Sequence, residues 1–201
     1  GTWYKIPICT RHQKQIHNMP RPPRKIDPNG TYHIISRGNN KSLIFHDTND
    51  YKVYILLLTE VKRSHGFYLY HYVLMPNHVH LLLKPNGDKL SKFMHAVQMK
   101  YAKYYCKKYN FIGHVWQGRF KNVEIGNDAQ LLACGNYIEM NPVRAGLVYR
   151  PEDWEWSSYN YYAHGAINPL VDPDPLFISS GGITETIRQK YQQTLDKTRA
   201  F

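Results

Sequence analysis

Two histidines separated by one residue, His78 and His80, lie within the apolar stretch LMPNHVHLLLKP, residues 74–85. Side chains alternate between the two faces of a β-strand, so in a strand both imidazoles point to the same side. Neutral imidazole is a frequent metal ligand, and two neighbouring rings can supply half of a metal site. The same spacing also occurs by chance in packed strands, so the pair alone does not decide between the two interpretations.

A second candidate pair, Tyr137 and Asn141, lies four residues apart in NYIEMNPVRAG, residues 136–146. On a helix this spacing places both side chains on one face. Tyr137 can instead be a packing residue, which is the ordinary role for any one of 17 tyrosines, and Asn141 can simply cap the helix before Pro142. Four other tyrosines are expected near the site and remain open alternatives: Tyr72, Tyr101, Tyr104 and Tyr105.

The chain is strongly basic, with 26 Lys and Arg against 15 Asp and Glu, a net charge of +11 and a pI of about 9.5. Such an excess in a single domain indicates a polyanionic partner, most simply nucleic acid. The alternative is a basic surface without a partner. Lysines recur along residues 90–109 without acidic residues between them, which favours DNA over an ordinary solvated helix face.

Length and composition limit the organisation of the chain. The 201 residues, 42% of them hydrophobic, suit one domain with short extensions. Residues 1–31 form a basic, Pro-rich segment that is either a disordered tail or an arm that follows phosphates. We expect the domain to span residues 32–162 and an extension of unassigned role to span residues 163–201.

Several classes of protein are excluded by other features. The cysteines, Cys9, Cys106 and Cys134, are widely spaced and form no CxxC pair, which argues against a disulfide scaffold and a Cys-ligated zinc site. No apolar run approaches the roughly 18 residues of a membrane span. We expect neither a membrane segment nor a signal peptide, and a reducing cytoplasmic location.

Periodicity and turn residues predict the elements that position these side chains. Strands are expected at residues 32–38, 67–75, 78–85 and 120–125. One helix is expected to be capped by Asn49 or Asp50 and to run to about Arg63, and a second to span residues 90–109. A third is expected to be capped by Asn127 or Asp128 and to run to about Met140, where Pro142 ends it, and a last helix to begin at about Thr184. The first six elements match a ferredoxin-like α+β fold, an antiparallel four-stranded sheet with helices on one face, followed by an added helix that carries Tyr137.

Three segments in this order, MPNHVHLLL, GHVWQGRF and NYIEMNPVRAG, resemble the HUH-type single-tyrosine transposases. Within that family the chain is most similar to the REP-associated tyrosine transposases. The resemblance covers residues 32–162, with WSSYNYYAHG as a weaker match, and it implies the HUH endonuclease fold. The HVH motif alone is not specific, whereas the three segments together are.

The resemblance implies a role for each matching residue. His78 and His80 match the histidines that bind a divalent metal, here Mg²⁺ or Mn²⁺, and Tyr137 matches the nucleophile. Asn141 matches a polar third ligand, which is glutamine in some relatives. The WQxRF signature, Trp116, Gln117, Arg119 and Phe120, is inferred to be structural or to contact DNA.

These roles fit a known chemistry. A tyrosine oxygen can attack a phosphodiester to leave a 5′-phosphotyrosine and a free 3′-OH, with a metal stabilising the charge that develops. We therefore expect a transposase or endonuclease that nicks and rejoins single-stranded DNA, with hairpin-forming repeats as its target. The predicted DNA contacts are Arg37, Lys100, Lys103, Lys107, Arg119, Lys121 and Arg144.

Two other functions are compatible with the same residues. The first is a domesticated protein that keeps the fold and binds DNA without catalysis. The second, ranked last, is a metallohydrolase for small substrates, which would need a general base that the spacing of Asp and Glu does not supply. The expected partner is single-stranded DNA, and both a monomer and a homodimer that exchanges the tyrosine helix are open.

Overall fold

The computed structural model describes residues 26–87 and 89–199. Most of the basic arm predicted over residues 1–31 therefore lies outside the described residues. Among the described residues, no helix is long and apolar enough to cross a membrane.

Four antiparallel strands form one sheet in the order β2-β3-β1-β4, as the ferredoxin-like prediction requires. The strands are β1 Thr31–Arg37, β2 Phe67–Met75, β3 His78–Pro85 and β4 Lys121–Ile125. The predicted limits of β2 and β3 are confirmed, and those of β1 and β4 differ by one residue. The histidine strand β3 is a central strand with a neighbour on each side, so its side chains are held rigidly.

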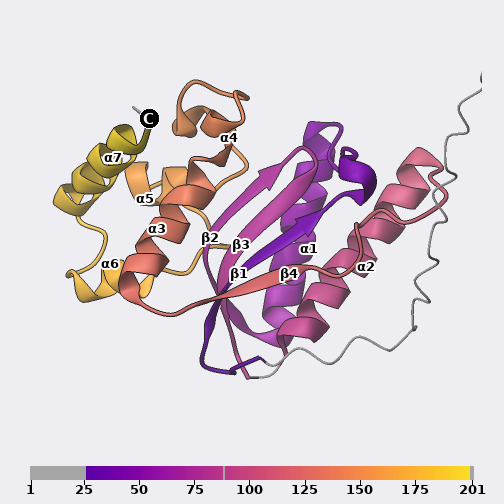
Figure 1. The fold of residues 1–201 in the computed structure, drawn as a ribbon, viewed down its shortest axis with the longest axis horizontal. Helices are drawn as coiled ribbons and strands as arrows, with labels where there is room; N and C mark the ends of the chain where they lie inside the picture. Colours follow the sequence, from indigo (N-terminus) through magenta and orange to yellow (C-terminus); the bar gives the residue numbers. More distant parts are fainter. Residues whose placement is uncertain (1–25, 88, 200–201) are drawn as a thin grey trace, which may run out of the picture.

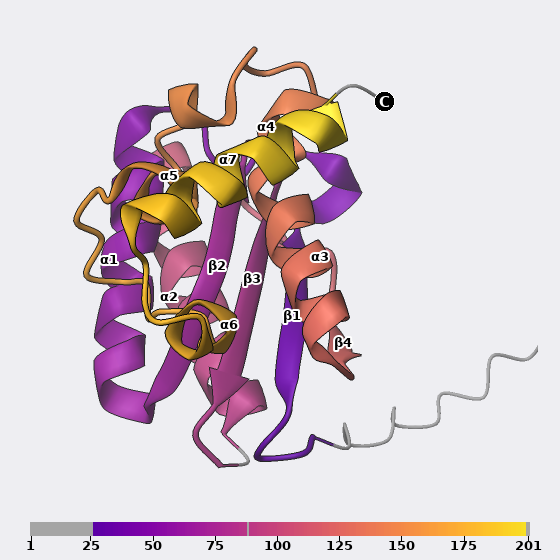
Figure 2. The ribbon, with the colours of Figure 1, turned by 90° about the vertical axis from the view of Figure 1, so that its left-hand side faces the viewer.

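Helices α1 (Thr48–His65) and α2 (Leu90–Tyr109) cover one face of the sheet, and α3 (Asp128–Glu139) lies on the opposite face (Figures 1 and 2). The main core lies under α1 and α2, where alternate strand residues such as Ile34 and Leu81 are fully buried. A smaller apolar cluster under α3 is built from Val73, Met75, Leu82, Leu131 and Ile138. The sheet is therefore apolar on both faces beneath its helices, and α3 is anchored independently of α1 and α2.

Local chemistry corrects two predicted helix ends. The cap of helix α1 lies two or three residues earlier than expected, because Asp47 accepts a hydrogen bond from the Asp50 amide and forms a reciprocal capping box with it. Asn127 caps α3, which confirms one of the two residues predicted for this cap. Pro142 does not end helical structure, because it occupies the first turn of the short helix α4 (Asn141–Arg144), where its missing N–H has no cost.

Residues 163–195 pack onto the sheet edge at β2 and onto α3 (Figure 2). The Asp172 carboxylate accepts from the Leu69 amide and pairs with Lys62, and Tyr191 and Leu195 are buried in the main core. The remaining elements are η1 Asn39–Lys41, η2 Pro151–Asp153, α5 Tyr159–His164, α6 Pro175–Ser179 and α7 Glu185–Arg199. Residues 163–195 thus share the core of the domain.

Candidate active site

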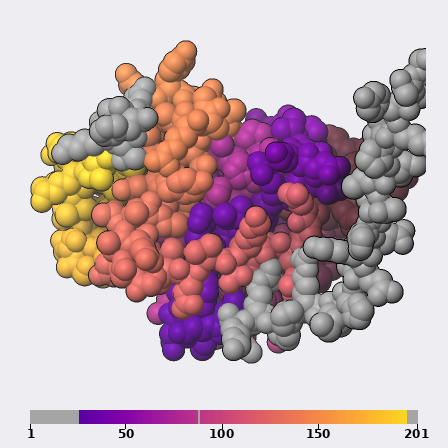
Figure 3. Space-filling model, in the orientation of Figure 1, coloured from indigo at the N-terminus to yellow at the C-terminus, as the bar shows by residue number. Residues whose placement is uncertain are grey.

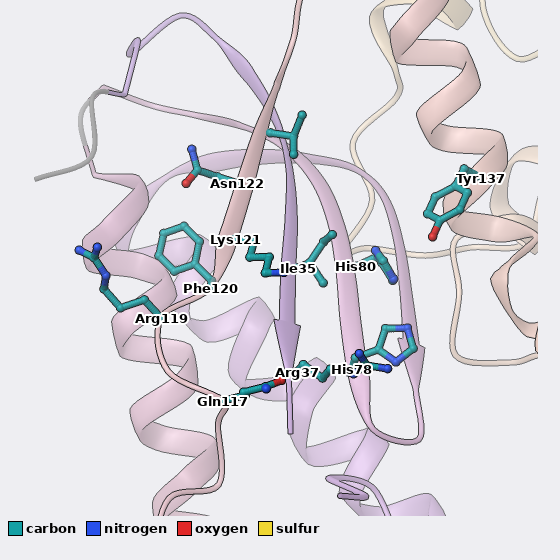
Figure 4. A pocket seen from close by; sticks show the side chains of 11 residues that line it. Ile35, Arg37, His78, His80, Gln117, Arg119, Phe120, Lys121, Asn122 and Tyr137 are labelled. Carbon is teal, nitrogen blue, oxygen red and sulfur yellow. The ribbon is translucent and has the colours of Figure 1, made fainter. Parts of the chain in front are cut away.

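The register of β1 on β3 brings polar side chains together on the face opposite α1 and α2. Ile35 pairs with His80 and Arg37 pairs with His78, so these four side chains share one side of the sheet. They line an open cavity of about 860 Å³ between α3 and β4 (Figure 4). The cavity is lined by Ile35, Arg37, His78, His80, Gln117, Arg119, Phe120, Lys121, Asn122, Val123 and Tyr137. In the space-filling view, β1 is visible at the surface between α3 and β4, which leaves this side of the sheet accessible (Figure 3).

Tyr137 lies on α3 and faces the histidine strand across the cavity. Its side chain is 41% exposed, its ring centroid is 5.8 Å from that of His80, and its hydroxyl points toward the strands (Figure 4). The Arg144 guanidinium lies over the ring at 5.3 Å from its centroid, close enough for a cation–π contact. Tyr137 is therefore not a packing residue: the structure presents its hydroxyl to the cavity.

Each of the two histidines has its Nδ1 atom engaged by a neighbour. His78 Nδ1 lies 2.6 Å from Asn77 Oδ1, in the turn between β2 and β3, and His80 Nδ1 lies 2.8 Å from His33 Nε2. Because a carboxamide oxygen only accepts, His78 carries its proton on Nδ1 and exposes the Nε2 lone pair. Sequence reasoning identified neither Asn77 nor His33 as part of the site.

The environment keeps these imidazoles neutral. Burial lowers the pKa of His78 to about 4, with a contribution from Arg37. Burial, with smaller contributions from His33, His78 and Arg37, lowers the pKa of His80 to about 3. Burial lowers the pKa of His33 to about 4. Neutral imidazole is the form that binds metals, so the rings fit a divalent cation near neutral pH.

The described residues contain no group of three His, Cys, Asp or Glu side chains that could hold a metal ion. Any further protein ligand beside His78 and His80 would have to be of another type, such as an amide oxygen. Asn141 donates its amide N–H to the carbonyl oxygens of Tyr137 and Ile138, at 2.8 and 3.4 Å. It thus caps the end of α3, and it is not among the residues that line the cavity.

The predicted DNA-contacting cations divide between two faces of the sheet. Arg37, Arg119 and Lys121 line the cavity, and Arg144 lies at Tyr137. Lys100, Lys103 and Lys107 lie on α2, on the other face. The lysines of α2 are also not free of acidic neighbours, because Lys100 pairs with Glu60 of α1. The structure therefore brings only the first group together with the histidines and Tyr137.

The four alternative tyrosines do not line the cavity. Tyr101 is fully buried beneath the sheet and donates to the Ile44 carbonyl oxygen, and burial raises the pKa of Tyr72 to about 12. Tyr104 donates to Asp50, and Tyr105 contacts His46. The expectation that these side chains lie near the site is wrong, which leaves Tyr137 as the tyrosine of the cavity.

The four-stranded antiparallel sheet, with two histidines on a central strand and a tyrosine on an added helix, is an α+β architecture of the kind that the three sequence segments indicate for a transposase. The chain belongs to the IS200-like transposase family, whose model (Transposase IS200 like) matches residues 28–141, more than half of the sequence. The resemblance inferred from the sequence motifs is thereby confirmed.

Individual relatives agree with this assignment. The chain is 27% identical over 133 residues to the REP-associated tyrosine transposase of Escherichia coli strain K12, covering 61% of this chain and 73% of the relative. It is 29% identical over 111 residues to a Haemophilus influenzae protein given the same name provisionally, covering 48% of this chain and 61% of that protein. A solved structure of a REP-associated tyrosine transposase bound to a REP hairpin has a TM-score of 0.63 and 23% identity, over 79% of this chain and 93% of that one, which supports the fold.

Proposed function

We propose that this protein nicks and rejoins single-stranded DNA through a 5′-phosphotyrosine at Tyr137, with a divalent metal held by His78 and His80. One observation carries the proposal: an exposed tyrosine faces two neutral imidazoles across a cavity whose other charged lining residues are all cations. Asn141 is the candidate for an additional oxygen ligand. When bound, Mg²⁺ or Mn²⁺ would act as a Lewis acid toward a nonbridging phosphate oxygen.

The reaction needs no external energy. The Tyr137 oxygen forms a bond to phosphorus while the bond from phosphorus to the 3′ oxygen breaks, giving a 5′-phosphotyrosine and a free 3′-OH. The phenol proton is lost and the departing 3′ oxygen gains one, so protons balance, and attack by a 3′-OH reverses the step. Arg144 restrains the orientation of the tyrosine ring through a cation–π contact, worth about 0.5–1 kcal/mol at exposed sites.

The cavity has the features of a path for a single strand. Arg37, Arg119 and Lys121 can follow phosphates, while Gln117 and Asn122 present amides that can bond to base edges. The names of the relatives refer to REP elements, and one solved relative is described as bound to a REP hairpin. We infer that the DNA of this protein likewise contains hairpin-forming repeats. A small-molecule metallohydrolase is disfavoured, because no Asp or Glu lines the cavity in the described chain.

The proposed function is tested with the wild-type protein and a labelled single-stranded oligonucleotide that contains a hairpin repeat. In the presence of Mg²⁺ or Mn²⁺, we expect a covalent protein–DNA adduct on a denaturing gel, and EDTA present from the start of the reaction should prevent its formation. A complex that is seen only on a native gel, with no adduct at any metal concentration, would indicate the inert DNA-binding alternative instead.

Removing one of the basic side chains that line the cavity should lower the affinity for DNA and make that affinity less dependent on salt concentration. For Arg119→Ala or Lys121→Ala, we expect the slope of log K against log salt to fall by about 0.7, the value for one lost phosphate contact on a single strand. Lys52→Ala, an exposed lysine on α1 on the far side of the sheet, is the matched control and should change neither quantity. Equal slopes in all of these variants would place the strand elsewhere.

A further inference from the structure

A third histidine, His33, contacts the proposed metal-binding pair from the neighbouring strand. Its Nε2 atom lies 2.8 Å from Nδ1 of His80, and the two rings stack with centroids 5.0 Å apart and an interplanar angle of 26°. The register of β1 on β3 pairs Ile35 with His80, so His33 is one step further along the same face of the sheet. The His33 ring also meets Tyr137 edge-on, with centroids 6.1 Å apart.

The short nitrogen–nitrogen distance requires one proton shared between two rings. If His80 carries that proton on Nδ1, its Nε2 has the free lone pair that a metal needs, and His33 must accept through an unprotonated Nε2. The opposite arrangement would place the His80 proton on Nε2 and prevent coordination there. Metal-binding histidines generally donate their second N–H to a fixed partner, which sets the tautomer and the ring orientation.

The neighbouring histidine has the same arrangement with a different partner. Asn77 Oδ1 accepts from His78 Nδ1, so Asn77 would serve His78 as His33 serves His80. His33 is not placed as a third metal ligand, because the described residues contain no three-histidine group with ligating geometry and its Nε2 is directed at Nδ1 of His80.

We propose that His33 is a positioning residue that holds His80 in the Nδ1–H tautomer and orients its Nε2 toward the cavity. The metal-binding consequence rests on the function proposed above. The tautomer of His80 in the metal-free protein does not depend on that function. Failure of the positioning role of His33 can therefore be distinguished from failure of the proposed function.

The first test is the tautomer of His80, read from long-range ¹H–¹⁵N NMR correlations of the metal-free protein at neutral pH. The wild type should show protonation at Nδ1. His33→Phe, which keeps a stacking ring but removes the acceptor, should give a mixture of both tautomers. His33→Gln supplies an amide oxygen in place of the ring nitrogen and should restore Nδ1 protonation. An unchanged His80 spectrum in His33→Phe would overturn the proposal.

The second test is Mn²⁺ affinity measured by calorimetry on the same proteins. His33→Phe should bind Mn²⁺ about 10- to 100-fold more weakly, the usual effect of losing an outer partner of a ligand. His33→Gln should recover most of that loss, and His95→Gln, at an exposed histidine of α2, should match the wild type. Equal affinities for wild type and His33→Phe contradict the proposal. Loss of all binding in both His33 variants, with folding retained, would instead identify His33 as a ligand and also overturn it.

Discussion

Replacing Tyr137 by phenylalanine is expected to reduce the covalent protein–DNA adduct to background while leaving DNA binding intact. The substitution removes only the hydroxyl oxygen that is proposed to attack phosphorus, and the ring that lies edge-on to His33 and His80 stays. The cation–π contact with Arg144 also survives, because phenylalanine presents a similar ring face. Adduct yield on a denaturing gel and DNA affinity on a native gel measure the two effects separately.

The matched control is Tyr149→Phe, which removes the hydroxyl of a tyrosine that is 86% exposed and does not line the active-site cavity. Its adduct yield should equal that of the wild type. An adduct that persists at the wild-type level in Tyr137→Phe would assign the nucleophile to another residue.

Mixing two inactive variants tests whether the site is formed within one chain. In the structure, Tyr137 approaches His80 of its own chain. A mixture of Tyr137→Phe and His80→Ala should therefore stay inactive, because each chain lacks one part of its own site. Restored adduct formation would show that the tyrosine helix is exchanged between two subunits.

The elements of the fold were largely predictable because periodicity and turn residues act locally. Strand-type composition between turn residues indicated the limits of β2 and β3, and the two-residue period of a strand was enough to place His78 and His80 on one face. The helical position of Tyr137 followed equally from local sequence. The start of α1 was misplaced because both Asp47 and Asp50 are acceptable caps, and only the reciprocal hydrogen bonds distinguish them.

The partners of these residues were not predictable, because they depend on pairing between distant segments. His33 becomes a neighbour of His80 only through the register of β1 on β3. A slip of one residue in that register would move the His33 side chain to the other face of the sheet. The same reasoning separates Lys121, in the cavity, from Lys103, on the other face of the sheet. The number of Lys and Arg residues gives the sign of the net charge, whereas only the fold topology determines on which face of the sheet each cation lies.

A buried polar cluster that no sequence pattern indicated fixes α3 to the sheet. Glu139, two residues after Tyr137, is fully buried and faces away from the cavity, where its Oε1 accepts from His71 Nδ1 at 2.8 Å and from Ser158 Oγ at 2.5 Å. Its Oε2 accepts from the Tyr191 hydroxyl at 2.6 Å, and Asp174 lies 3.2 Å from His71 Nε2. The cluster thus connects the helix that carries Tyr137 with β2, α7 and the segments before α5 and α6.

Close packing leaves little room for this cluster to relax. A Cβ atom at Gly135 on α3 would lie 2.8 Å from His71 Nε2, so glycine permits the approach of the helix to the imidazole. The Tyr162 ring stacks on the His71 ring with centroids 4.4 Å apart. A group removed from this cluster would leave its partners buried without water to replace it.

The cluster makes stability depend on pH above neutrality. Burial alone would lower the pKa of His71, but the charges of Glu139 and Asp174 and their hydrogen bonds raise it from 6.5 to about 9. A raised pKa in the folded state stabilises the protein fully below pH 6.5, and this contribution is lost as pH rises through 9. At about 1.4 kcal/mol per pH unit the loss is of the order of 3 kcal/mol. Urea unfolding at several pH values should show this decline.

Glu139→Gln should be strongly destabilising although it preserves the shape of the side chain. It removes a buried charge opposite His71, so we expect a loss of about 3 kcal/mol in the free energy of unfolding and a melting temperature about 10 °C lower. The decline in stability between pH 6.5 and 9 should also shrink, because His71 loses the larger of its two charge partners. Glu155→Gln, at an exposed glutamate, should stay within about 0.5 kcal/mol of the wild type. If Glu139→Gln unfolds at the wild-type urea concentration with the wild-type pH profile, the buried carboxylate does not anchor α3, and the position of Tyr137 must be maintained by apolar packing alone.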